Sequence, residues 1–188
     1  MADFTVHTIE TAPDQSVELL EGARKAFGFV PNLIGVLAES PAAAEAYLTL
    51  SQIFDKSSLS PAERQVAILA FSRYNECDYC MAAHSVIASM QKVPADVIQA
   101  LRNDQPIKDT KLEALRTFAT TVVAKRGWVS GDDVAAFLSV GYDNAQILEI
   151  ILAASLKTIS NYANHVAETP IDDAFANRAW QPVKKPAA

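Results

Sequence analysis

The stretch SPAERQVAILAFSRYNECDYCMAAHS, residues 60–85, decides the fold of this chain. Ser60, a proline and then Glu63 form the pattern of a helical capping box, so a helix is predicted to begin here. This helix is apolar nearly all round, which indicates burial. A second helix is predicted from Glu76–Asp78 to about Gln91. The stretch therefore predicts a buried helix followed at once by a helix that carries both cysteines.

Cys77, Cys80 and His84 are spaced i, i+3 and i+7, which places them on one face of the second helix. Two thiols one turn apart can close a disulfide, and an imidazole one turn further can exchange the proton that thiol chemistry requires. The helix start favours a thiolate at Cys77, but the carboxylate of Glu76 opposes it. His84 is better placed to reach Cys80. We therefore expect Cys80 to attack and Cys77 to resolve the oxidised sulfur.

The composition favours an acidic, all-α protein. Half of the 188 residues are hydrophobic and only 6 are glycine. The formal net charge of −6 argues against a nucleic-acid partner. Apolar runs fall short of the ~20 residues that span a bilayer, and no secretory leader is recognisable at the N-terminus. We expect a cytoplasmic protein without a membrane partner, in which paired cysteines are more often catalytic or metal-binding than structural.

The chain is predicted to be a single domain, residues 1–188, with an N-terminal arm over 1–12 and a C-terminal tail over 181–188. Apolar periodicity and capping residues predict further helices: Asp14 to Gly28, Asn32 to Glu39, Ser40 to Phe54, Pro94 to Arg102, Asp109 or Thr110 to Gly127, Ser130 to Gly141, and Asp143 or Asn144 to about Ala167. A weak internal repeat aligns His84 with His165 and Gln65 with Gln146. It suggests a duplicated helical pair, with chance similarity as the alternative.

Other interpretations of the cysteines remain open. They could be buried as small hydrophobic residues beside a core histidine. A zinc site could use Cys77, Cys80, His84 and a fourth ligand such as His165, although structural zinc usually shows a second ligand pair at short spacing. A thioredoxin-type domain is not indicated, because its motif follows a strand. We expect neither a metal nor a bound organic cofactor.

Residues 60–85 resemble the core of the alkylhydroperoxidase AhpD and carboxymuconolactone decarboxylase superfamily, through PAER at 61–64, NECDYC at 75–80 and AAHS at 82–85. The segments FGFVPNL at 27–33, RGWVS at 126–130 and KTISNYANH at 157–165 resemble a peroxidase-related branch of it. The resemblance implies an all-helical fold, homo-oligomers from dimers and trimers to hexamers, and reduction of hydroperoxides. In AhpD, electrons arrive through lipoyl groups and pass to a peroxiredoxin, so a dithiol electron donor is implied.

By this resemblance Cys80 is the peroxidatic cysteine, Cys77 the resolving cysteine and His84 the proton-relay histidine. Two positions depart from the AhpD pattern. Gln65 stands where AhpD has its relay glutamate, and Tyr79 stands where AhpD has a histidine between the cysteines. Gln65 cannot ionise, so base catalysis would rest on His84, and the result would be a slow peroxidase or a different reaction.

Two carboxylates could replace the relay glutamate. Glu63 lies two residues from Gln65, but its capping role is the stronger interpretation. Glu149 belongs to a polar row on the last long helix, together with Lys157, Asn161 and His165. The row could form a hydrogen-bond network within or between subunits. The sharper hypothesis is that Glu149 faces the cysteine site, with His165 in support.

The function predicted from these observations is a thiol-dependent peroxidase, an oxidoreductase that cycles through a Cys77–Cys80 disulfide. Two alternatives remain at this stage. The first is a carboxymuconolactone decarboxylase-like enzyme on the same fold, in which the cysteines would be dispensable. The second is a non-enzymatic redox-sensing or binding protein, whose thiols would oxidise once and not cycle.

Overall fold

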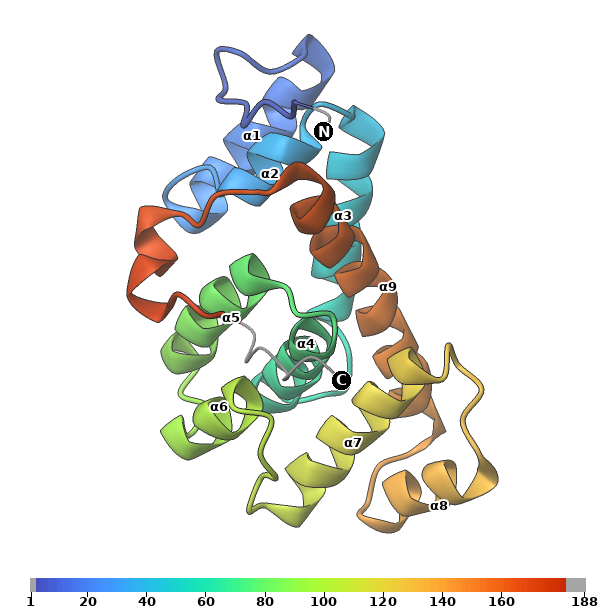
Figure 1. Ribbon diagram of the computed structural model, residues 1–188. Coiled ribbons are helices and arrows are strands. Elements are labelled where there is room, and N and C mark those ends of the chain that lie inside the picture. The colour runs from blue at the N-terminus through green and yellow to red at the C-terminus, as the bar shows by residue number, and fades with distance from the viewer. Residues whose placement is uncertain (1–2, 182–188) are drawn as a thin grey trace, which may run out of the picture.

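The computed structural model describes residues 3–181, and this range folds into helices without a strand (Figure 1). The helices are α1 (Asp14–Phe27), α2 (Asn32–Leu37), α3 (Pro41–Phe54), α4 (Pro61–Tyr74), α5 (Asp78–Met90), α6 (Ala95–Arg102), α7 (Thr110–Ala124), α8 (Gly131–Ser139), α9 (Asn144–Ala167) and the 3₁₀ helix η1 (Asp173–Arg178). The all-α prediction is confirmed. None of these helices has both the length and the hydropathy needed to cross a bilayer.

Capping residues set most helix boundaries at the predicted places. The Ser60 hydroxyl accepts from the Glu63 amide at 3.3 Å, and the Glu63 carboxylate accepts from the Ser60 amide at 2.8 Å. Gly28 ends α1 at φ 84°, a left-handed conformation that costs glycine little. One cap differs from the prediction, because Pro13 takes the N-cap position of α1 and Asp14 lies in its first turn. There its carboxylate still lies near the positive N-terminal end of the helix dipole, which stabilises a negative charge.

Helix α4 lies in the middle of the molecule (Figure 1) and packs against α5, α6, α7 and α9. Its residues 65–72 are all buried, as its apolar sequence predicted. Helix α9 runs along α3 and also contacts α5. The central helix thus holds α5 and α9 in fixed positions relative to each other.

The predicted duplication is not present at the level of helices. Gln65 and His84 lie on two helices, α4 and α5, whereas Gln146 and His165 lie on the single helix α9. The 24 residues of α9 contain no turn that could correspond to the one between α4 and α5.

The segment after α9 folds back over the N-terminal end of α5 and the helices beside it (Figure 1). Arg102 of α6 donates to the carbonyl groups of Arg178 and Ala179. Phe175 is buried against Tyr79 and Phe29. Of the predicted tail 181–188, only residue 181 lies within the described residues. The predicted arm is described from residue 3 onward, and within it the His7 amide donates to the Gly35 carbonyl.

Candidate active site

The turn between α4 and α5 delivers the cysteines. Helix α4 ends with the Glu76 amide bonded to the Arg73 carbonyl and the Cys77 amide bonded to the Ser72 carbonyl. This pairing requires Glu76 to adopt a left-handed conformation, with φ 56°. Cys77 is both the last residue of this cap and the N-cap of α5. Cys80 therefore lies one turn into α5, and both cysteines are buried and free.

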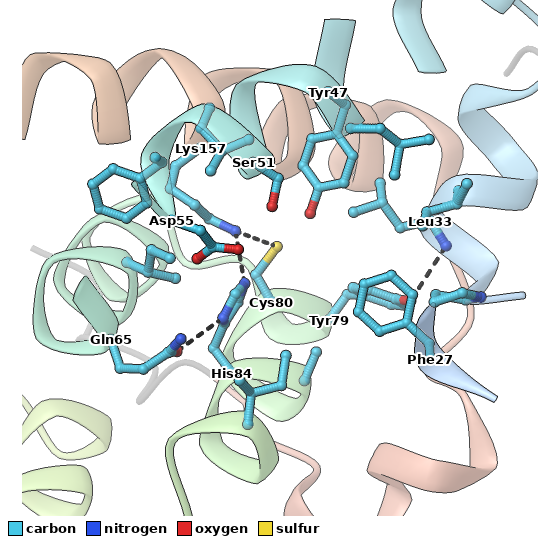
Figure 2. Close-up of a pocket in the computed structure, with 18 of the residues that line it drawn as sticks. Phe27, Leu33, Tyr47, Ser51, Asp55, Gln65, Tyr79, Cys80, His84 and Lys157 are labelled. Atoms are coloured by element: carbon cyan, nitrogen blue, oxygen red, sulfur yellow. Dashed lines mark hydrogen bonds between the residues drawn. The ribbon is translucent and has the colours of Figure 1, made fainter. Parts of the chain in front are cut away.

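A pocket of about 200 Å³ opens beside α5 and has the Cys80 sulfur in its wall (Figure 2). Cys77 is not part of that wall. Much of the lining is aromatic, contributed by Phe27, Tyr47, Phe54, Tyr79 and Phe175. Since Cys80 alone presents its sulfur to the pocket, a small molecule that enters meets Cys80 first.

Lys157 of α9 lies between Cys80 and His84. Its ammonium donates to the Cys80 sulfur at 3.2 Å and lies 3.4 Å from His84 Nε2 (Figure 2). The Lys157 side chain is only 1% exposed. Within the described part of the chain no carboxylate forms an ion pair with it. The direct contact predicted between His84 and Cys80 is thus replaced by a contact through a buried cation.

The surroundings of the two sulfurs shift the pKa values of Cys77 and Cys80 in opposite directions. Burial raises the pKa of the Cys80 thiol, but a hydrogen bond from Cys77 and the charge of Lys157 outweigh burial and hold this pKa well below its usual value. The hydrogen bond to Cys80 and burial both raise the pKa of Cys77. These surroundings therefore favour the thiolate form of Cys80 and the protonated form of Cys77, whose thiol donates to it.

Asn164 supplies a further donor to the sulfurs. Its Nδ2 lies 3.3 Å from the Cys80 sulfur and 3.7 Å from the Cys77 sulfur. Asn164 is buried on α9, one turn beyond Asn161, whose amide oxygen accepts from Asn75. The sequence pattern singled out the row that contains Lys157 and Asn161, without assigning either to the cysteines. Asn164 lies outside that row and carried no signal of its own.

The hydrogen bonds of His84 fix its protonation. Its Nδ1 lies 3.1 Å from the Gln65 side-chain oxygen, which can only accept, so Nδ1 carries the proton and Nε2 accepts from Lys157. Burial, followed by the charge of Lys157, holds the pKa of His84 well below its usual value. His84 is therefore neutral, with both ring nitrogens in use. It orients Lys157 and does not contact the sulfur.

Two of the carboxylates considered from the sequence lie elsewhere. The hypothesis that Glu149 faces the cysteine site is wrong, because its carboxylate accepts from the amide and hydroxyl of Ser58 at 2.7 and 2.8 Å. Glu63 keeps its capping role and pairs with Lys111 at 3.3 Å. Among the residues that line the pocket, the acidic one is Asp55, whose side chain is 68% exposed.

Tyr79 and His165 are also absent from the hydrogen bonds found around the Cys80 sulfur in the described residues. The Tyr79 hydroxyl donates to Asp172 at 2.5 Å and accepts from the Leu33 amide, so it ties α5 to α2 and to the C-terminal segment. Burial and then Asp172 raise the pKa of Tyr79. His165 is exposed, so the zinc ligand set Cys77, Cys80, His84 and His165 is not brought together. Residues 3–181 contain no other cluster of three His, Cys, Asp or Glu side chains suited to a metal ion.

Solved structures share this fold. An uncharacterised peroxidase-related protein with an alkylhydroperoxidase AhpD core, from Ralstonia eutropha JMP134, is 21% identical over 92% of this chain and 93% of its own, with a TM-score of 0.79. An uncharacterised peroxidase-related protein from Silicibacter sp. TM1040 is 18% identical over 94% of each chain, with a TM-score of 0.79. The debrominase Bmp8, solved with 2,3,4-tribromopyrrole, is 18% identical over 88% of this chain and 89% of its own, with a TM-score of 0.74.

Sequence comparison relates the middle of the chain to a known family. No curated protein matches the chain. Residues 41–121 match the model of the Carboxymuconolactone decarboxylase family. The match includes Cys77, Cys80 and His84 and leaves out Lys157 and Asn164. The chain is therefore similar to this family over residues 41–121, and it shares the fold of a peroxidase-related protein with an AhpD core.

Proposed function

We propose that this protein is a thiol-dependent peroxidase in which Cys80 reduces hydroperoxides. The observation that carries the proposal is the Cys80 sulfur, which lines the pocket and accepts from the Lys157 ammonium at 3.2 Å, a contact that favours the thiolate. A thiolate is the nucleophilic form of cysteine, and a cation beside it can neutralise the charge that moves to the leaving oxygen. The fold shared with two peroxidase-related proteins supports the same assignment.

In the first step the Cys80 thiolate attacks the terminal oxygen of a hydroperoxide ROOH. The S–O bond forms, the O–O bond breaks, and the alkoxide takes a proton from the Lys157 ammonium. The products are Cys80 sulfenic acid, the alcohol ROH and a neutral Lys157 amine, so charge and protons balance. Lys157 is suited to this transfer because its ammonium already contacts the sulfur that is attacked.

In the second step the Cys77 thiol condenses with the sulfenic acid. Lys157 takes the Cys77 proton, the S–S bond forms, and the departing hydroxide leaves as water after it recovers that proton. Asn164 contacts both sulfurs and can hold them in place during this step. A dithiol donor then reduces the disulfide by attack on Cys80, the sulfur that lines the pocket. A lipoyl group would fit the donor chemistry, and a peroxiredoxin would be a partner that takes electrons from the reduced pair.

The test is stoichiometric. One equivalent of cumene hydroperoxide should remove both free thiols and release one equivalent of alcohol, and dihydrolipoamide should restore both thiols and support turnover. Cys80→Ser should abolish both results, and Cys77→Ser should allow one oxidation without a disulfide. If both thiols persist in the wild type, or if Cys80→Ser turns over at the wild-type rate, the proposal is wrong.

A second candidate is reductive dehalogenation of an aromatic ring. The aromatic lining around the Cys80 thiolate supports it, as does the fold shared with a debrominase. Cys80 would take bromine from the ring, Lys157 would protonate the ring carbanion, and Cys77 would close the disulfide and release bromide. Bromide release from tribromopyrrole, with thiols unchanged by hydroperoxide, would select this function. If a Cys77→Ser/Cys80→Ser variant still decarboxylates a ring lactone, the protein instead performs decarboxylase-like chemistry, which needs neither sulfur.

We further propose that the protein works in the cytoplasm as a homo-oligomer. A dithiol cycle suits a reducing compartment. Leu148, Tyr162 and Val166 leave apolar surface exposed along α9, which another subunit could cover. Light scattering should give a multiple of the 20.3 kDa chain mass, and a monomeric mass would contradict the oligomer.

A further inference from the structure

Lys157 holds its nitrogen close enough to Cys80 to form a bond with the sulfur, a reaction that the peroxidase cycle does not require. Its Nζ lies 3.2 Å from the Cys80 sulfur, which is within the ~3–3.5 Å typical of atoms about to react. Both side chains are about 1% exposed, so little water competes for the sulfur from this side. Lys157 also reaches the site from α9, which is held against α4 and α5. The nitrogen is therefore held beside the sulfur by the fold.

The peroxide step prepares this nitrogen as a nucleophile. When Lys157 gives its proton to the leaving alkoxide, it becomes a neutral amine with a lone pair. At the same moment Cys80 becomes a sulfenic acid, whose sulfur is electrophilic and is known to condense with nitrogen as well as with thiols. Cys77 must lose a proton before it can attack, and burial and its hydrogen bond to Cys80 raise its pKa. The amine needs no such activation.

We propose that Lys157 is a second resolving residue, which captures Cys80 sulfenic acid as a Cys80–Lys157 sulfenamide whenever Cys77 is not free to react. The Lys157 nitrogen attacks the Cys80 sulfur, the S–N bond forms and the S–O bond breaks. The hydroxide leaves with the proton released by nitrogen, as water, and no further oxidant is needed.

The sulfenamide keeps the sulfur recoverable. A donor thiol attacks the Cys80 sulfur, the S–N bond breaks, and the nitrogen takes the thiol proton. The product is a mixed disulfide, and a second thiol releases Cys80. Without capture, a further peroxide would convert the sulfenic acid to a sulfinic acid, which ordinary thiols do not reduce. This inference rests on the proposed function, because it requires that hydroperoxide first oxidise Cys80.

The experiment uses the full chain with Cys77→Ala, treated with one equivalent of cumene hydroperoxide, quenched in acid and digested with trypsin. In the oxidised fraction cleavage after Lys157 should be lost, because a substituted lysine is not a trypsin site. Residues 74–92 should then be found joined to residues 127–178. This product should be about 2 Da lighter than the two peptides together, for the two hydrogens lost. Dithiothreitol should separate them.

The matched control is Cys77→Ala/Lys157→Arg, which keeps a cation beside Cys80 but offers no amine lone pair. With one equivalent of cumene hydroperoxide it should accumulate sulfenic acid, trapped by dimedone, and a second equivalent should convert that to a sulfinic acid about 32 Da heavier than the thiol. If Cys77→Ala folds poorly by circular dichroism, Cys77→Ser, which differs from the wild type by one atom, replaces it in both experiments.

The two ways to fail are distinct. If the single variant forms a dimedone-reactive sulfenic acid and trypsin still cuts after Lys157, the sulfenamide is excluded and the peroxidase proposal stands. If the wild type keeps both thiols after hydroperoxide, the peroxidase proposal itself is wrong, and the sulfenamide with it.

Discussion

The polar residues in the two halves of α9 have different kinds of partner. In the first half, Gln146 closes a capping box with Asp143, and Glu149 binds the loop at Ser58. In the second half, Lys157 and Asn164 are buried and both donate to the Cys80 sulfur. One continuous helix therefore has a structural half, whose polar residues hold the fold, and a chemical half, whose polar residues contact the Cys80 sulfur.

The difference shows how to separate structural from chemical polar groups. A buried lysine costs free energy unless a partner compensates for lost hydration. For Glu149 the partners are backbone and hydroxyl donors that complete a loop, so its role ends with stability. For Lys157 the partner is a thiolate that faces a pocket. His84 Nε2 is a neutral second partner, so the charge of Lys157 is balanced only while that sulfur is ionised, which links the charge on α9 to the reactivity of α5.

The largest effect should follow from Lys157→Met, which removes the cation of the chemical half. Burial should then raise the pKa of Cys80, so the sulfur becomes a thiol at neutral pH. Peroxide turnover should fall by about 10²–10⁴-fold, the range expected for a lost general acid. Alkylation by iodoacetamide should be pH-independent near neutrality in the wild type and should rise only at alkaline pH in the variant. A neutral-pH alkylation rate equal to that of the wild type would contradict the role of Lys157.

A smaller effect should follow from Asn164→Leu, which keeps similar volume but removes the amide donor to both sulfurs. Hydrogen bonds to charged groups contribute about 1.5–3 kcal/mol, so the pKa of Cys80 should rise by about one unit or more. The midpoint of the acid limb of the alkylation profile should move upward by that amount. An unchanged midpoint would show that Lys157 and Cys77 suffice to hold the thiolate.

Gln65→Glu should change the chemical half more mildly, by about a few-fold in turnover. A carboxylate beside His84 Nδ1 favours the imidazolium and so raises the pKa of His84 from its lowered value. Once protonated, His84 can no longer accept from Lys157, and kcat/KM should acquire a new limb that falls with decreasing pH. Identical pH profiles for variant and wild type would show that His84 does not orient Lys157.

Glu149→Gln should leave turnover unchanged and lower only the stability. The charge-assisted bonds to Ser58 become neutral, so the free energy of unfolding in urea should fall by about 1 kcal/mol. The alkylation rate of Cys80 should match the wild type at every pH. A slower rate would show that Glu149 does influence the cysteine site, and the contrast between the two halves of α9 would then be wrong.

Local signals determined most of the helices and the first part of the site. Ser60, Glu63 and Gly28 act within one or two turns, so their meaning can be inferred from neighbouring residues. Cys77 and Cys80 are likewise neighbours, one at the N-cap of α5 and one a turn later. The sequence also correctly indicated that α4 would be buried, since its apolar residues leave no face for water.

The tertiary structure alone decided which charges meet the sulfur. Lys157 is 77 residues from Cys80, and Glu149 is 91 residues from Ser58. A polar row on α9 shows which residues share a face, but the register of α9 against α4 and α5 comes from side-chain packing across the core, which no local pattern encodes. That register put Lys157 where the sequence suggested His84 would act alone, and it placed Glu149 at a loop.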